Sequence, residues 1–62
     1  MRRPKYNVED RVKIIHNGST YRTKGSEGEI IDIEPEDNGI LYYVRLNGGD
    51  EFYYNERDIQ KI

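Results

Sequence analysis

The stretch ILYYVRLNGGDEFYY (residues 40–54) decides the fold of this chain of 62 residues. Residues 40–46 alternate between two sets of side chains, which is the pattern of a half-buried β-strand. The set expected inside is Ile40, Tyr42, Val44 and Leu46, and the set expected outside is Leu41, Tyr43 and Arg45. Asn47-Gly48-Gly49 then suits a three-residue loop with Gly49 in the left-handed bulge position. The stretch therefore predicts an antiparallel hairpin.

The length of this loop determines which residues face each other across the hairpin. A three-residue loop brings core residues opposite core residues and leaves an opposite-charge pair outside. Its pairs are Val44 with Phe52, Tyr42 with Tyr54, Tyr43 with Tyr53, and Arg45 with Glu51. A two-residue Gly48-Gly49 loop would instead place Val44 opposite Tyr53. We prefer the first register because both faces of the hairpin are then consistent.

Two strands are expected before this hairpin. Residues 11–16 alternate, with Val12 and Ile14 on the inner face. Residues 27–34 form the second strand, in which Gly28 suits a bulge or a close crossing of two backbones. The polar segment between these strands is expected to be a long loop.

The remaining segments complete a small fold. Residues 35–39 are expected to form a turn and residues 55–58 a tight turn. A short last strand over residues 59–62 would close a barrel with Ile59 and Ile62. We therefore predict an all-β protein built as a small five-stranded antiparallel barrel.

Composition limits what the chain can do. Its length suits one domain, expected over residues 8–62, after a basic lead-in at residues 1–7. The absence of cysteine excludes disulfides and zinc–cysteine sites. No apolar run suits a signal peptide or a membrane span, so we expect a cytoplasmic protein. The single histidine, His16, has no nucleophile or ligand cluster around it, so we expect no enzyme, cofactor, metal or small-molecule substrate.

The charge is unevenly distributed along the sequence. Residues 1–24 sum to +5 and residues 25–62 to −7, which gives the formal net charge of −2. Such a two-signed molecule can steer oppositely charged partners to one face. The alternative is that the two halves neutralise each other in the folded domain.

Several ordered groups carry a resemblance to a known fold: DRVKI at residues 10–14, GSEGEIIDI at 25–33, YYVRL at 42–46 and DIQKI at 58–62. Together they resemble SH3-like barrels, and in particular KOW-type modules and small barrel accessory subunits such as photosystem I subunit IV. The resemblance implies five strands, one turn of 3₁₀ helix before the last strand, and binding through loops at the rim of the barrel. Barrels of this kind serve many unrelated functions.

Exposed tyrosines are the strongest functional candidates. Tyr43 and Tyr53 should lie side by side on the outer face, with Arg45 beside them and Tyr21 on the long loop. Tyrosine and arginine are enriched where proteins bind each other. We therefore predict a non-enzymatic binding module for a protein partner, an accessory protein whose composition would suit a phage or a bacterium. The alternatives are that these tyrosines only cover a thin core, or that the chain weakly self-associates.

Nucleic acid is the alternative partner. Its candidate residues are all basic: Arg2, Arg3, Lys5, Lys13, Arg22 and Lys24. Tyr6 or Tyr21 would be available to stack on bases. KOW-type relatives contact RNA or RNA polymerase, whereas the acidic net charge argues against this function.

An acidic stretch forms the counterpart of these basic residues. It contains Glu27, Glu29, Asp32, Glu34, Glu36 and Asp37. These carboxylates would dock a basic protein surface, mimic nucleic-acid phosphates, or keep a strand soluble and free of edge-to-edge pairing. Simple alternation predicts that Asp32 points to the same side as Ile30.

Overall fold

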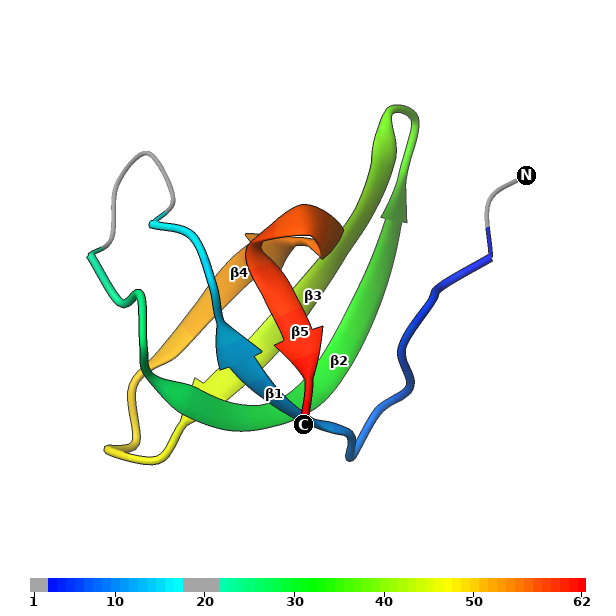
Figure 1. The fold of residues 1–62 in the computed structure, drawn as a ribbon. Helices are drawn as coiled ribbons and strands as arrows, with labels where there is room; N and C mark the ends of the chain where they lie inside the picture. Colours follow the sequence, from blue (N-terminus) through cyan, green and yellow to red (C-terminus); the bar gives the residue numbers. More distant parts are fainter. Residues whose placement is uncertain (1–2, 18–21) are drawn as a thin grey trace.

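The structure, a computed structural model, describes residues 3–17 and 22–62. These residues form five strands and one 3₁₀ turn (Figure 1). The elements are β1 (Arg11–Ile14), β2 (Glu27–Glu36), β3 (Gly39–Leu46), β4 (Glu51–Asn55), the 3₁₀ turn η1 (Glu56–Asp58) and β5 (Ile59–Lys61). The predicted all-β fold, with a 3₁₀ turn before the last strand, is confirmed. In the described part of the chain no helix is long and apolar enough to cross a membrane.

All five strands belong to one antiparallel sheet in the order β4-β3-β2-β1-β5. The long strand β2 is shared: β1 pairs with its first three residues, and β3 pairs along almost its whole length. β4 and β5 form the two edges of the sheet, and in the described residues no pairing joins them. Strand pairing therefore defines a five-stranded sheet that is open between β4 and β5.

The β3–β4 hairpin has the register predicted for a three-residue loop. Tyr43 lies opposite Tyr53, and Val44 lies opposite Phe52. The Gly49 N–H donates to the Leu46 carbonyl oxygen at 2.8 Å. Gly49 has φ of 102°, the left-handed conformation that this loop requires. The prediction of this hairpin is confirmed in every pair.

Gly28 lies where two backbones approach closely. It is opposite Val12 on one side and Leu46 on the other. A Cβ atom at this position would lie 2.3 Å from the Arg45 carbonyl oxygen, so only glycine fits. The close crossing predicted at Gly28 is confirmed, whereas the bulge of β2 lies further along, between Ile30 and Asp32.

The bulge changes which residues of β2 face outward. Ile31 is the extra residue, so the alternation of β2 shifts by one position after it. Ile30 is buried, Asp32 is exposed and Ile33 packs against the core. The expectation that Asp32 shares the side of Ile30 is therefore wrong, because it assumed an unbroken strand.

β2 also extends further than expected. It continues through Pro35 and Glu36, so the turn is confined to Asp37 and Asn38. Pro35 lies opposite Ile40. In the described chain no strand pairs with the other edge of β2 at this point, and proline is tolerated in such edge segments.

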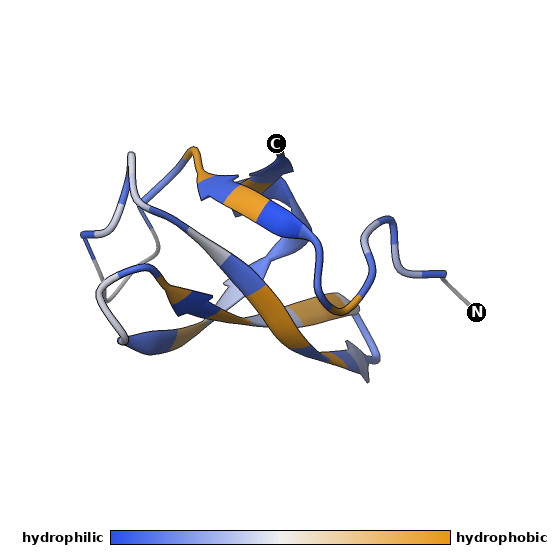
Figure 2. Cartoon of the chain, turned by 90° about the horizontal axis from the view of Figure 1, so that it is seen from below, coloured by the Kyte–Doolittle hydropathy of each residue, from blue (hydrophilic) through white to orange (hydrophobic). Residues whose placement is uncertain are grey.

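The core lies on the inner side of the sheet. Figure 2 shows apolar and polar bands alternating along the strands, as expected when one face is buried. The buried apolar residues that form the core are Tyr6, Val12, Ile14, Ile30, Ile40, Tyr42, Val44, Leu46, Tyr54 and Ile59. The inward positions of Val12 and Ile14, predicted from alternation, are confirmed, and Ile59, expected in the core at the last strand, is buried as well.

The two ends of the chain depart from expectation. Tyr6, only 6% exposed, enters the core from the N-terminal segment. Ile62 is 65% exposed and does not close the core. Ile62 is three residues beyond Ile59, and an odd spacing places two residues of an extended segment on opposite faces. The expected core contact of Ile62 is therefore wrong.

Candidate functional site: the outer face of β2, β3 and β4

Side chains that point away from the core on three neighbouring strands form one surface, which we call the outer face. Residues that are directly opposite in an antiparallel pair project to the same side, so the register defines its members. They are Glu29, Asp32, Glu34 and Glu36 of β2, Leu41, Tyr43 and Arg45 of β3, and Glu51, Tyr53 and Asn55 of β4. Five of these residues are acidic and only Arg45 is basic.

Two tyrosines occupy the middle of the outer face. The ring centroids of Tyr43 and Tyr53 are 4.5 Å apart, with an interplanar angle of 35°. Tyr53 is 47% exposed even though it is in contact with Tyr43. The predicted side-by-side placement of the two rings is confirmed. An exposed aromatic pair on a rigid sheet offers a large contact area with little side-chain entropy to lose.

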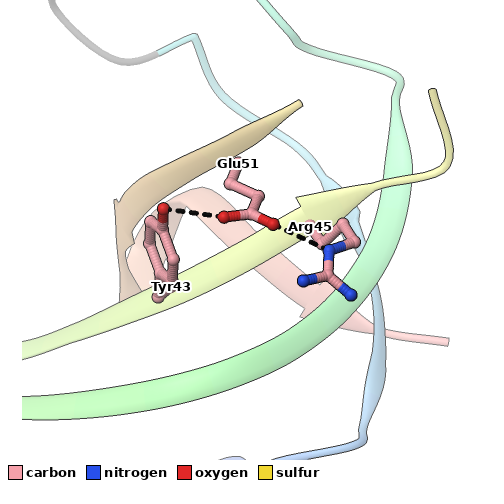
Figure 3. Close-up of polar contacts among 3 residues, drawn as sticks. All are labelled: Tyr43, Arg45 and Glu51. Atoms are coloured by element: carbon pink, nitrogen blue, oxygen red, sulfur yellow. Dashed lines mark hydrogen bonds and ion pairs between the residues drawn. The ribbon is translucent and has the colours of Figure 1, made fainter. Parts of the chain in front are cut away.

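Glu51 holds Tyr43 and Arg45 in place. The Tyr43 hydroxyl donates to Glu51 Oε1 at 2.9 Å, and Arg45 Nε donates to Glu51 Oε2 at 2.8 Å (Figure 3). The bond from Arg45, followed by the bond from Tyr43, lowers the pKa of Glu51. In return, the bond to Glu51 is the main cause that raises the pKa of Tyr43. Sequence reasoning placed Glu51 only opposite Arg45 and missed its bond to Tyr43.

Three carboxylates of β2 lie near Tyr53. Burial raises the pKa of the Tyr53 hydroxyl, and the negative charges of Glu34, Asp32 and Glu36 raise it further. We call these three residues the acid row. Among residues 3–17 and 22–62 none of them forms an ion pair. The bulge at Ile31 places Asp32 opposite Tyr43, so this cluster was not visible from alternation alone.

The acidic side chains are spaced along the strand instead of surrounding one point. In the described residues no three His, Asp or Glu side chains are placed to hold a metal ion together. His16 is exposed beyond the end of β1. The acidic side chains of the outer face therefore form a row and do not converge on one point.

The basic candidate residues fall into separate groups. The N-terminal segment, which carries Arg3 and Lys5, and the loop before β2, which carries Arg22 and Lys24, lie on opposite sides of the molecule (Figure 1). Lys13 is exposed on β1, opposite Glu27 and Gln60. The structure therefore does not bring the described candidates together in one patch. Arg2 and Tyr21 lie outside the described residues.

Tyr6 is not available to stack on bases, contrary to expectation. Its ring meets the Tyr42 ring edge-on, with centroids 5.6 Å apart and an interplanar angle of 63°. The Tyr6 hydroxyl donates to the Ile59 carbonyl oxygen at 3.4 Å. Tyr6 is therefore a core residue, and it adds a large side chain to the small core of this domain.

A concave site lies apart from the Tyr43–Tyr53 pair, between the N-terminal segment and the 3₁₀ turn. It has a volume of about 480 Å³, and its lining includes Lys5, Glu56 and Arg57. Glu56 accepts hydrogen bonds there from the Tyr42 hydroxyl and from the Lys5 backbone N–H. These charges are of mixed sign, so the hollow offers less charge selectivity than the outer face.

Comparisons with known proteins add no relative. No family model matches the chain, and no match was found among curated proteins or solved structures. The function must therefore be argued from the residues themselves.

Proposed function

We propose that this protein is a small non-enzymatic binding module, an accessory or regulatory protein with an SH3-like barrel, which binds a protein partner through its outer face. The strand order and the 3₁₀ turn before β5 support the fold part of this proposal. The functional part depends on one observation, the exposed Tyr43–Tyr53 pair at the centre of the outer face.

The neighbours of this pair support an interface. Leu41 is half-buried beside Tyr43 on the same strand face, while Arg45 and Asn55 lie at the ends of the patch. Protein interfaces commonly have an aromatic centre inside a polar rim, with tyrosine and arginine enriched. Because Glu51 already orders Tyr43 and Arg45, less side-chain entropy is lost on binding.

Capture of partners from lysate tests this proposal. Wild-type protein should retain a specific partner, and the double variant Tyr43→Ala/Tyr53→Ala should lose at least about tenfold in affinity, as expected for hot-spot residues. The matched control is Val8→Ala/Ile62→Ala, which removes two exposed apolar side chains outside the outer face. Circular dichroism should show that both variants are folded. Equal capture by the tyrosine variant and the wild type would refute the proposal.

Nucleic-acid binding is the second candidate, and one observation favours it. The Gly25 N–H donates to the Ile14 carbonyl oxygen at 2.8 Å, which brings the loop that carries Lys24 beside the end of β1 after Lys13. Retention on single-stranded DNA should then fall as salt rises, and Lys13→Gln/Lys24→Gln should weaken it. A protein that is not retained even at low salt would exclude this candidate.

A further inference from the structure

The acid row and the Tyr43–Tyr53 pair together specify the chemistry of the partner. Asp32 lies opposite Tyr43, and Glu34 lies opposite Leu41, so carboxylates border the aromatic centre along β2. In the described residues no lysine or arginine neutralises the acid row. The single cation of the outer face, Arg45, is already paired with Glu51 at 2.8 Å.

We propose that the partner contacts the outer face with a segment rich in lysine or arginine, and that one cationic side chain lies on the Tyr53 ring within reach of the acid row. This inference rests on the proposed function and adds the identity of the recognised group. A cation is attracted to the face of a tyrosine ring, and carboxylates around the ring add to that attraction.

Charge complementarity favours a basic protein segment over a nucleic acid or a second copy of the chain as the binding partner. The phosphates of a nucleic acid would be repelled by the acidic side chains of the outer face. A second copy of the chain would have to present a basic surface of its own. The N-terminal segment with Arg3 and Lys5 and the loop with Arg22 and Lys24 lie on opposite sides of the molecule, so these four residues form no continuous surface to match the acid row.

Titration with defined peptides tests the charge requirement. The probes are octalysine and octaarginine, with octaglutamate as the negative control, at about 150 mM salt, where long-range attraction is screened. The acid-row variant is Asp32→Asn/Glu34→Gln/Glu36→Gln. The control variant is Glu9→Gln/Glu27→Gln/Asp50→Asn, which removes three acidic charges outside the acid row. Both variants raise the formal net charge from −2 to +1, so they differ only in where charge is removed.

The acid-row variant should bind the cationic peptides about tenfold more weakly than wild type, and the control variant should change affinity less than about threefold. NMR shift changes on binding should be centred on residues 32–36, 43 and 53. Equal losses in the two variants would mean unspecific attraction to an acidic protein and would overturn the inference. Preferred binding of single-stranded DNA at the outer face would overturn it as well.

The ring requirement is tested at Tyr53. Tyr53→Phe keeps the aromatic face and should bind the peptides within about twofold of wild type, whereas Tyr53→Leu should bind about fivefold more weakly. Affinity that is unchanged in Tyr53→Leu would refute the placement of the cation on this ring.

Capture of the partner by the three variants distinguishes failure of this inference from failure of the proposed function. If the partner is lost from Tyr43→Ala/Tyr53→Ala and from the acid-row variant, both are supported. If it is lost from the tyrosine variant but held equally by the acid-row and control variants, the binding face stands and the basic partner is refuted. Sedimentation that shows a dimer abolished by the acid-row variant would assign the outer face to a second copy and overturn the inference.

Discussion

Tyr42 and Tyr43 are neighbours on β3, yet they belong to opposite surfaces of the molecule. Tyr42 is fully buried, contacts Tyr6, and donates to Glu56 Oε2 at 2.6 Å. Tyr43 points outward, contacts Tyr53 and donates to Glu51 Oε1 at 2.9 Å. Each hydroxyl thus has a glutamate acceptor and each ring has an aromatic neighbour. The comparison shows that the face of the strand, and not the type of contact, separates a core residue from a candidate binding residue.

The pKa values of both tyrosines are raised, but the main cause differs between the buried residue and the outer one. Burial is the main cause that raises the pKa of Tyr42, and its bond to Glu56 comes second. For Tyr43 the order is reversed, and the bond to Glu51 comes first. Tyr53 is 47% exposed, so a partner can reach the outer pair, whereas Tyr42 is fully buried.

Truncation of the two rings should give the largest contrast. Tyr42→Ala should lower the free energy of unfolding by about 3–5 kcal/mol, because it leaves a cavity in the core. A domain of this size has only about 3–9 kcal/mol in total, so Tyr42→Ala should remove about a third or more of its stability. Tyr43→Ala should cost about 1 kcal/mol or less, since it removes a half-exposed cross-strand pair. Urea unfolding followed by circular dichroism measures both values, and equal losses would contradict the division into two surfaces.

Removal of the hydroxyls alone should give a smaller contrast. The Tyr42 hydroxyl accepts from the Lys5 backbone N–H at 2.9 Å while it donates to Glu56. Tyr42→Phe should therefore cost about 1–3 kcal/mol, the range for a lost bond to a charged group with a partner left unsatisfied. Tyr43→Phe should cost less than about 0.5 kcal/mol, because water replaces its bond to Glu51. Urea midpoints of the two variants would decide this, and a larger loss in Tyr43→Phe would reverse our assignment.

The inner and outer positions of β3 and β4 could be predicted because local rules determine them. Loop length and the Gly49 conformation set the register, and alternation then places Tyr42 inside and Tyr43 outside. Both the inward position of Tyr42 and the exposed pair of Tyr43 with Tyr53 follow from these two rules.

The surroundings of the two tyrosines could not be predicted in the same way. Tyr6 reaches Tyr42 from a segment without alternation, so only the folded chain shows that they meet. The bulge at Ile31 was hidden because Ile30, Ile31 and Ile33 are all isoleucine, and either phase of alternation supplies an apolar residue to the core. The acid row beside Tyr53 depends on that bulge. The electrostatics of the candidate site is therefore the part that required the structure.

Replacement of each glutamate acceptor by glutamine should give the smallest effect. It is also the most specific one, because it changes mainly the pKa of the tyrosine that donates to that glutamate. Glu51→Gln should lower the pKa of Tyr43 toward its ordinary value of 10.0, because it removes the main cause of the shift. Glu56→Gln should lower the pKa of Tyr42 only in part, because burial, the larger cause, remains. NMR titration of the tyrosine ring carbons measures each group separately. A shift of Tyr43 in Glu56→Gln would mean that the two surfaces are coupled.

Glu51 and Tyr43 should each contribute to the dependence of stability on pH, Glu51 at the acidic end of the range and Tyr43 at the alkaline end. The folded-state pKa of Glu51 lies below its ordinary value of 4.5, so its contribution is complete above pH 4.5 and is lost as the pH falls through the lower value. The folded-state pKa of Tyr43 is raised, so its contribution is complete below pH 10.0 and is lost as the pH rises through the higher value. The acid-side contribution depends first on the Arg45–Glu51 bond and then on the Tyr43–Glu51 bond, whereas the alkaline-side contribution depends mainly on the Tyr43–Glu51 bond. Glu51→Gln should therefore flatten the stability profile at both ends, whereas Tyr43→Phe should flatten the alkaline end and leave the part of the acid limb that Arg45 maintains. An unchanged acid limb in Glu51→Gln would show that Glu51 does not order the outer face.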